Sequence, residues 1–119
     1  MDDGVDYWEA HPEPSDVELA ELAEAWVRYQ SAEGVDADRE DDADWWACQA
    51  VISVDPARPD LEWRVLRCLC EAADPPSEKT VGSIGAGPLE DFLWNQGADA
   101  LDLIEPAADS DPVLLDALT

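Results

Sequence analysis

The chain has 119 residues, a length typical of one domain, and 30 carboxylates against six lysines and arginines give it a formal net charge of −24. Such a charge argues against direct binding to DNA, RNA or an anionic membrane, because that binding requires cationic side chains to neutralise phosphate. A hydrophobic content of 46%, with six tryptophans, excludes a disordered acidic tail.

Residues 1–14 combine carboxylates and prolines with a single apolar pair, Tyr7 and Trp8. They predict an extended arm that Trp8 pins to the domain, or alternatively a short helical turn at Trp8. His11 is the only histidine in the chain, so we assign it no catalytic role. Residues 15–119 are expected to form one all-helical domain.

The first predicted helix of this domain begins after Ser15. Ser15 and Glu18 have the spacing of a capping box, and apolar residues follow at helical period until about Ala32. Glu18, Glu21 and Glu24 lie off that apolar stripe and form an acidic face. This face is either solvated surface or a docking site.

Residues 33–44 are the most acidic segment, with carboxylates at Asp36, Asp38, Glu40, Asp41, Asp42 and Asp44. Alternate carboxylates suggest a calcium-binding loop. The sixth loop position, however, is Asp41 where glycine is required, and the twelfth is Ala47 where a bidentate glutamate is required. We therefore predict no calcium site here.

A second helix is predicted from Asp44, with an apolar stripe at Ala47, Ala50, Val51 and Val54. Trp45 and Trp46 point about 100° apart on such a helix, so both can be buried only at a crowded junction. An exposed one would be a candidate anchor for a partner, although the core is the favoured place for both.

The third predicted helix spans about residues 60–73 and is apolar nearly all round, which is typical of a buried central helix. Arg64 and Arg67 are expected to pair with carboxylates of an adjacent helix. The three cysteines include no C-x-x-C pair, so we expect reduced thiols. With no signal peptide and no long apolar run expected, the predicted location is the cytoplasm.

A glycine turn followed by a short helix over 88–96 is predicted at the centre of the second half. Gly85 and Gly87 permit a sharp turn, Pro88 suits the first helical position, and Gly97 is a natural stop. The motif comprises Gly85, Gly87, Pro88, Leu89, Glu90 and Asp91. A phosphate site is the alternative, but the glycine spacing matches no nucleotide motif and two carboxylates would repel an anion.

Two further helices are predicted near the C-terminus. One begins near Asp99 and is interrupted by Pro106. The last opens at Asp111 and Pro112, an N-cap followed by proline. Its residues Val113, Leu114, Leu115 and Leu118 are expected to lie against the core.

The run Ala86-Gly87-Pro88-Leu89-Glu90-Asp91-Phe92-Leu93, followed by Gly97 and then Leu103-Ile104-Glu105, resembles a family of small bacterial proteins of unknown function. The likeness covers about residues 59–118, and Ala25-Trp26 is the main similarity before that range. Pro106 departs from the family, which has a helix former there. The resemblance implies a tryptophan-containing, all-helical fold and no particular activity.

Helices separated by short proline or glycine turns predict an all-α domain of five to six short helices, packed as stacked antiparallel pairs of the HEAT type. The favoured function is a non-catalytic acidic protein that docks on or neutralises a basic protein partner, such as an immunity protein, an inhibitor or a nucleic-acid mimic. Its expected contact residues are the carboxylates named above from Glu18 to Asp44, together with Trp45.

Two alternatives remain open. One is a scaffold subunit of a larger assembly, whose acidity reflects its host. The other is a carboxylate-based enzyme, for instance with Glu90 and Asp91 as acid and base. We expect no metal, no cofactor and no catalytic residue, because no histidine pair, nucleophile elbow or metal-ligand spacing is present.

Overall fold

The computed structural model describes residues 3–31, 44–73 and 77–118, and these residues contain helices but no strand. The α-helices are α1 (Asp3–Ala10), α2 (Asp16–Ser31), α3 (Trp45–Ile52), α4 (Pro59–Ala72), α5 (Glu78–Ile84), α6 (Glu90–Gln96), α7 (Ala98–Ala108) and α8 (Pro112–Leu118), and a π-helical segment η1 (Gly85–Leu89) joins α5 to α6. The all-α prediction is confirmed, with more helices in the described residues than the five to six expected.

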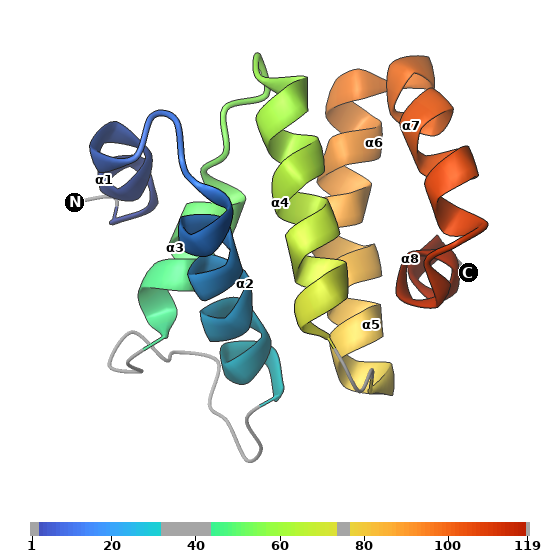
Figure 1. Ribbon diagram of the computed structural model, residues 1–119, viewed down its shortest axis with the longest axis horizontal. Helices are drawn as coiled ribbons and strands as arrows, with labels where there is room; N and C mark the ends of the chain where they lie inside the picture. The colour runs from blue at the N-terminus through green and yellow to red at the C-terminus, as the bar shows by residue number, and fades with distance from the viewer. Residues whose placement is uncertain (1–2, 32–43, 74–76, 119) are drawn as a thin grey trace.

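Helix α1 corrects the prediction of an extended N-terminal arm, because residues 3–10 are helical. The Trp8 indole N–H donates a hydrogen bond to the Ala50 carbonyl at 2.7 Å, and the Tyr7 ring packs against Trp46. An eight-residue helix is marginal alone, so these contacts with α3 stabilise it. Figure 1 shows α1 lying beside α3 at one end of the molecule.

Helix α4 lies at the centre of the fold, with α2 on one side and α5, α6 and α8 on the other (Figure 1). Its buried side chains include Leu61, Val65, Leu66 and Leu69, as its nearly continuous apolar surface predicts. The α2 stripe of Leu19, Leu22, Ala23 and Trp26 is buried against it. These contacts fix the position of the surface between α2 and α4.

The predicted glycine turn before residue 88 is wrong, because α5, η1 and α6 form one continuous helical rod. Gly85 has the right-handed helical angles φ −64° and ψ −41°, and Gly97 (φ 58°) is the one described residue with positive φ. The rod buries Thr80, Ile84, Leu89 and Phe92. The five-residue step from Ile84 to Leu89 coincides with the wider π turn, which keeps both residues on the core side and accommodates Pro88.

Pro106 does not interrupt α7, which continues to Ala108. It lies in the last turn, where only the bond to the carbonyl of Asp102 is lost, so the predicted break is wrong. Helix α8 begins as predicted, with the Leu114 N–H donating to the Asp111 carboxylate at 3.2 Å. Val113 and Leu114 are buried, but the expected burial of Leu115 and Leu118 is also wrong, since they are 50% and 39% exposed.

Candidate binding surface

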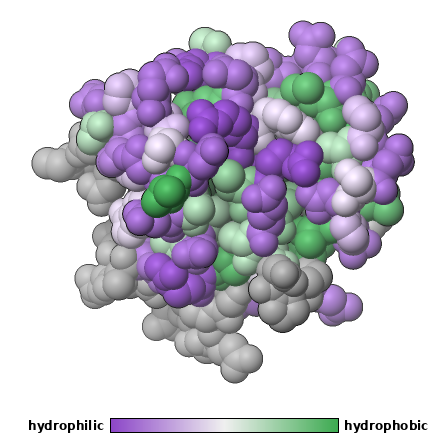
Figure 2. All heavy atoms as spheres, viewed as in Figure 1, coloured by the Kyte–Doolittle hydropathy of each residue, from purple (hydrophilic) through white to green (hydrophobic). Residues whose placement is uncertain are grey.

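A groove of about 560 Å³ runs between α2 and α4. It is lined by small or apolar side chains, namely Ala20, Trp63, Cys68 and Ala72, and by charged side chains, namely Asp16, Glu24, Arg64, Arg67 and Glu71. On the face seen in Figure 2, weakly hydrophobic residues gather in the middle of the molecule between hydrophilic borders. This α2–α4 groove is the first candidate site.

The two arginines of the α2–α4 groove are neutralised within the chain. Arg64 donates to the Asp16 carboxylate at 3.2 Å and to the Pro14 carbonyl at 3.1 Å. Arg67 Nε lies 3.6 Å from the Asp111 carboxylate, and its guanidinium stands 5.5 Å from the centre of the Trp63 ring. The predicted pairing of both arginines is confirmed. The groove therefore keeps an acidic character, supplied by Glu24 and Glu71.

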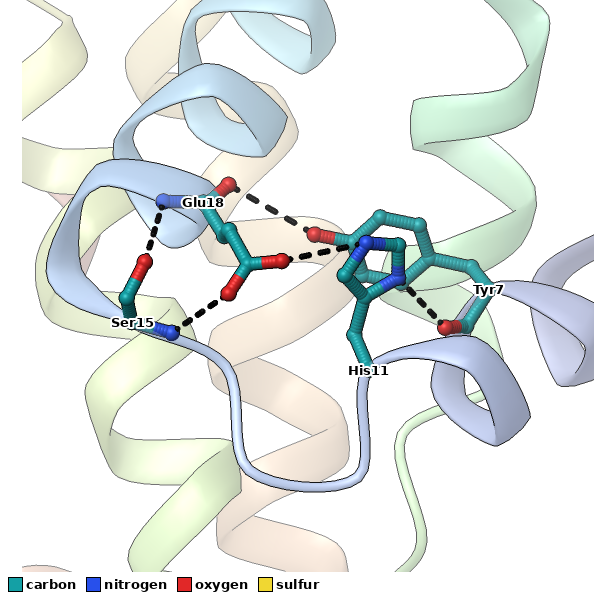
Figure 3. A network of polar contacts seen from close by, with 4 residues as sticks. All are labelled: Tyr7, His11, Ser15 and Glu18. Carbon is teal, nitrogen blue, oxygen red and sulfur yellow. Dashed lines mark hydrogen bonds and ion pairs between the residues drawn. The ribbon is translucent and has the colours of Figure 1, made fainter.

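Glu18 is occupied by the capping box that begins α2. The Ser15 N–H donates to Glu18 Oε1 at 2.9 Å, and the Glu18 N–H donates to Ser15 Oγ at 3.1 Å (Figure 3). The hydrogen bond from the Ser15 N–H is the largest cause that holds the pKa of Glu18 below its ordinary value of 4.5. Glu18 thus has a structural role in addition to the partner contact predicted for it.

The same network ties α1 to α2. His11 Nε2 lies 3.1 Å from Glu18 Oε2, and His11 Nδ1 lies 2.9 Å from the Tyr7 carbonyl oxygen (Figure 3). The His11 ring stacks on Tyr7 at 4.4 Å, and the Tyr7 hydroxyl reaches the Glu18 carbonyl at 3.5 Å. Burial, followed by the charges of Glu18 and Glu21, raises the pKa of Tyr7. In this network Ser15 Oγ accepts a hydrogen bond from the Glu18 backbone N–H at the start of α2. The four residues therefore form a junction between the two helices.

The other predicted contact residues are divided between surface and structure. Glu21 and Glu24 are exposed on α2. Asp44 pairs with Arg28 through two hydrogen bonds of 3.1 and 3.2 Å, and Trp45 is half-buried against Tyr29. The predicted residues Asp36, Asp38, Glu40, Asp41 and Asp42 lie outside the described part of the chain.

Trp94 is the most exposed large apolar side chain described, at 88%. It stands on α6 two residues after the buried Phe92, and about 200° separates such positions around a helix. Trp26 is buried, whereas Trp45 and Trp46 are both half-buried. Helical spacing alone could have placed Trp94 outside, because Leu89, Phe92 and Leu93 define the core face of its helix.

Two further features had weaker sequence signals. On α7, the carboxylates Asp99, Asp102 and Glu105 are all exposed and repeat at three-residue intervals, and the exposed Asp109 follows the end of the helix. At the N-terminal end of α4, Glu62 is buried beside a second cleft of about 260 Å³ between α3, α4 and α6. The cleft beside Glu62 is lined by residues of α3, α4, η1 and α6, so no local pattern could reveal it.

The cysteines are poor nucleophiles in this fold. None of the three forms a disulfide; Cys48 and Cys70 are buried, and Cys68 is half-buried and lines the α2–α4 groove. Burial raises the pKa of Cys70 to about 12 and, together with the charge of Glu71, also raises that of Cys68. Such thiols stay protonated near neutral pH.

The carboxylate pair considered for catalysis, Glu90 and Asp91, is exposed at the start of α6. Glu90 borders neither the α2–α4 groove nor the cleft beside Glu62, whereas Asp91 lines the latter.

Among residues 3–31, 44–73 and 77–118, no three histidine, cysteine or carboxylate side chains are grouped closely enough to bind a metal ion. Within the same ranges, no helix is long and apolar enough to cross a membrane.

Comparison with known proteins identifies a family and no close relative. No curated protein matches the chain, and no solved structure matches it. A match to the "Family of unknown function (DUF6869)" covers residues 34–119, which include α3 to α8 and the run around Pro88 on which the resemblance was based. The chain therefore belongs to this family of unknown function.

Proposed function

We propose that the protein is a non-catalytic acidic binding protein that docks on a basic protein partner. One observation carries this proposal: the four described arginines are all held in ion pairs within the chain. The pairs are Arg28 with Asp44, Arg58 with Glu13 and Asp60, Arg64 with Asp16, and Arg67 with Asp111. These pairs occupy the described arginines, so the excess of carboxylates that gives the net charge of −24 stays uncompensated.

The α2–α4 groove is the proposed docking surface. Its exposed carboxylates attract a cationic segment and speed the encounter, while Ala20, Trp63 and Ala72 offer apolar contact. A basic amphipathic helix has both properties, because its apolar stripe can contact these three side chains while its lysines and arginines face the carboxylates. The reduced thiols favour a cytoplasmic setting for this interaction.

A particular form of the proposal is mimicry of nucleic acid, as an inhibitor or immunity protein would use. It is favoured by the exposed α7 carboxylates Asp99, Asp102 and Glu105. With a rise of about 1.5 Å per residue, these three charges span roughly 9 Å along one helix. A protein that normally binds phosphates would meet a comparable row of negative charge.

A scaffold role is the second candidate, favoured by a different observation. Leu115 and Leu118 stand three residues apart on α8 and are both substantially exposed. Residues at this spacing share one helix face, so they form an apolar pair suited to a neighbouring subunit. A double substitution, Leu115→Ser with Leu118→Ser, would dissociate such an assembly in sedimentation experiments and leave a charge-driven interaction intact.

The docking proposal is tested by capture of partners on the immobilised protein at about 0.1 M and about 1 M NaCl. A basic protein retained at low salt and released at high salt is expected, because charges separated by more than about 3 Å are screened at 1 M. The double variant Glu24→Gln/Glu71→Gln should weaken capture more than the matched variant Asp99→Asn/Asp102→Asn if the α2–α4 groove is the interface. A partner held equally well at both salt concentrations would contradict electrostatic docking.

A further inference from the structure

Glu62 is a buried carboxylate beside a cleft. It lies in the first turn of α4, is 8% exposed, and accepts hydrogen bonds from Asn95 Nδ2 at 3.2 Å and Gln96 Nε2 at 2.8 Å. Gln96 Nε2 also donates to the Pro56 carbonyl at 2.8 Å, which holds the end of α6 against the loop before α4. Both partners of the carboxylate are neutral amides.

No cation neutralises Glu62 within the described residues, where no lysine, arginine or histidine forms an ion pair with it. Arg58 is only four residues away but is directed elsewhere, toward Glu13, Asp60 and the Pro12 carbonyl. The N-terminal position on α4 and the two amides solvate the negative charge without cancelling it. A buried carboxylate of this kind favours a cationic partner, provided that a route from the surface exists.

The cleft beside Glu62 provides that route. It has a volume of about 260 Å³, and its apolar walls come from Val51, Ile52, Val54, Val65, Leu66 and Pro88. Asp91 and Asn95 complete the lining, and Asp91 is an exposed carboxylate. Ile52 is 70% exposed, so an apolar side chain also stands where a partner would enter.

We propose that this cleft receives an arginine side chain from the basic protein partner, with the guanidinium at Glu62 and Asp91 and the methylene stem against the apolar walls. The inference rests on the proposed function and adds a second contact site, in the cleft between α3, α4 and α6, to the α2–α4 groove. A carboxylate offers about four acceptor positions, and Glu62 uses two of them for amides. A guanidinium is less strongly hydrated than an ammonium group and is suited to a partly buried ion pair, so arginine is preferred to lysine.

The probe for this site is N-acetyl-arginine N-methylamide, titrated into ¹⁵N-labelled full-length protein and followed by NMR. The side-chain amide signals of Asn95 and Gln96 report on Glu62 directly, because both groups bond its carboxylate. Saturable shifts of these two signals are expected, with a dissociation constant on the order of 1 mM for a single side chain. N-acetyl-citrulline N-methylamide has nearly the same shape without the charge and should bind at least about tenfold more weakly.

Two neutralising variants separate the cleft from the general acidity of the surface. Glu62→Gln should weaken binding of the arginine probe at least about tenfold, whereas Glu90→Gln removes an equal charge from an exposed position outside the cleft and should leave it nearly unchanged. Asp91→Asn, at an exposed position that tolerates substitution, should weaken binding about threefold and provides a readout even if Glu62→Gln folds poorly.

Equal shifts with arginine and citrulline, or equal losses from Glu62→Gln and Glu90→Gln, would overturn the proposed arginine site. Salt-sensitive capture of a basic partner that survives Glu62→Gln would likewise overturn the site while leaving the proposed function in place. Saturable, Glu62-dependent arginine binding without salt-sensitive capture of any basic protein would instead support the site and contradict the proposed function.

Discussion

Gly85 and Ala117 approach so closely that a Cβ atom built on residue 85 would lie 2.6 Å from the Ala117 carbonyl oxygen. Gly85 is helical, so its glycine is required by the proximity of the two backbones and not by an unusual conformation. The contact brings the C-terminal end of α8 onto the helical rod at the point where the π turn widens it.

Gly85→Ala is therefore expected to destabilise the fold, by about 1–3 kcal/mol, because the backbone of α8 must shift to admit one methyl group. Gly82→Ala is the matched control, since a Cβ there meets nothing within 4 Å in the same rod. It should stabilise the protein by about 0.5–1 kcal/mol through the ordinary preference of a helix for alanine. Urea unfolding of both variants measures the difference, and equal effects would contradict the role of the close contact.

Phe92 and Trp94 stand two residues apart on α6 and have opposite exposures of 1% and 88%. Phe92→Ala should cost about 3–5 kcal/mol, because it leaves a cavity beneath Trp63, whose ring stacks on Phe92 at 5.7 Å. Trp94→Ala should change the free energy of unfolding by less than about 0.5 kcal/mol. Thermal unfolding tests both, and a large cost for Trp94→Ala would mean that another part of the protein covers it.

Most of the fold could be predicted because its signals are local. The capping box at Ser15, the apolar stripe of α2 and the glycine stop at Gly97 each depend on residues within one or two turns. The glycine turn before Pro88 was predicted wrongly because the same residues also fit a π turn. Tertiary packing decides between the two, since Ile84 and Leu89 must both reach the core.

The candidate site was predicted less well. Exposed glutamates of α2 follow from helical period, and Glu21 and Glu24 are exposed as that period requires. The burial of Glu62 does not follow from its own helix, because the side chains that bond its carboxylate, Asn95 and Gln96, come from α6. The N-terminal arm was misjudged for a similar reason, since α1 is held by a hydrogen bond from Trp8 to Ala50, which is 42 residues away.

Thiol chemistry provides an independent test of the packing around α4. Cys68 is half-buried and Cys70 is buried with a pKa of about 12, so Cys68 should be alkylated first by iodoacetamide at pH 8. Cys70 should react only as fast as the protein opens, and all three thiols should react quickly in concentrated urea. Mass spectrometry of the digested protein measures the order, and rapid native labelling of Cys70 would contradict its burial.

The junction between α1 and α2 should weaken in acid. The pKa of Glu18 is lowered in the folded protein, so its ionised form contributes stability that is present above the ordinary value of 4.5 and lost as the pH falls through the lower folded value. Glu18→Gln preserves the capping-box spacing but removes the charge. The stability difference between wild type and this variant should therefore shrink between about pH 5 and pH 3. A difference that stays constant with pH would contradict the contribution of the charge, and Glu21→Gln is the matched control for an exposed glutamate.

Salt should stabilise the whole protein, because the repulsion among its carboxylates exceeds the attraction in its few ion pairs. The net charge is −24, while the described arginine pairs are at least partly exposed and individually contribute little. Raising NaCl from about 10 mM to about 0.5 M shortens the screening length from roughly 30 Å to less than 10 Å, so long-range repulsion is suppressed. The midpoint of thermal unfolding should rise over this range, and it should rise less in a triple variant, Asp99→Asn/Asp102→Asn/Glu105→Gln, that begins with a lower charge. A midpoint that falls with salt would mean that the attraction in pairs such as Arg28 with Asp44 exceeds the repulsion among the carboxylates. It would also contradict the negative field that is proposed to attract a basic partner.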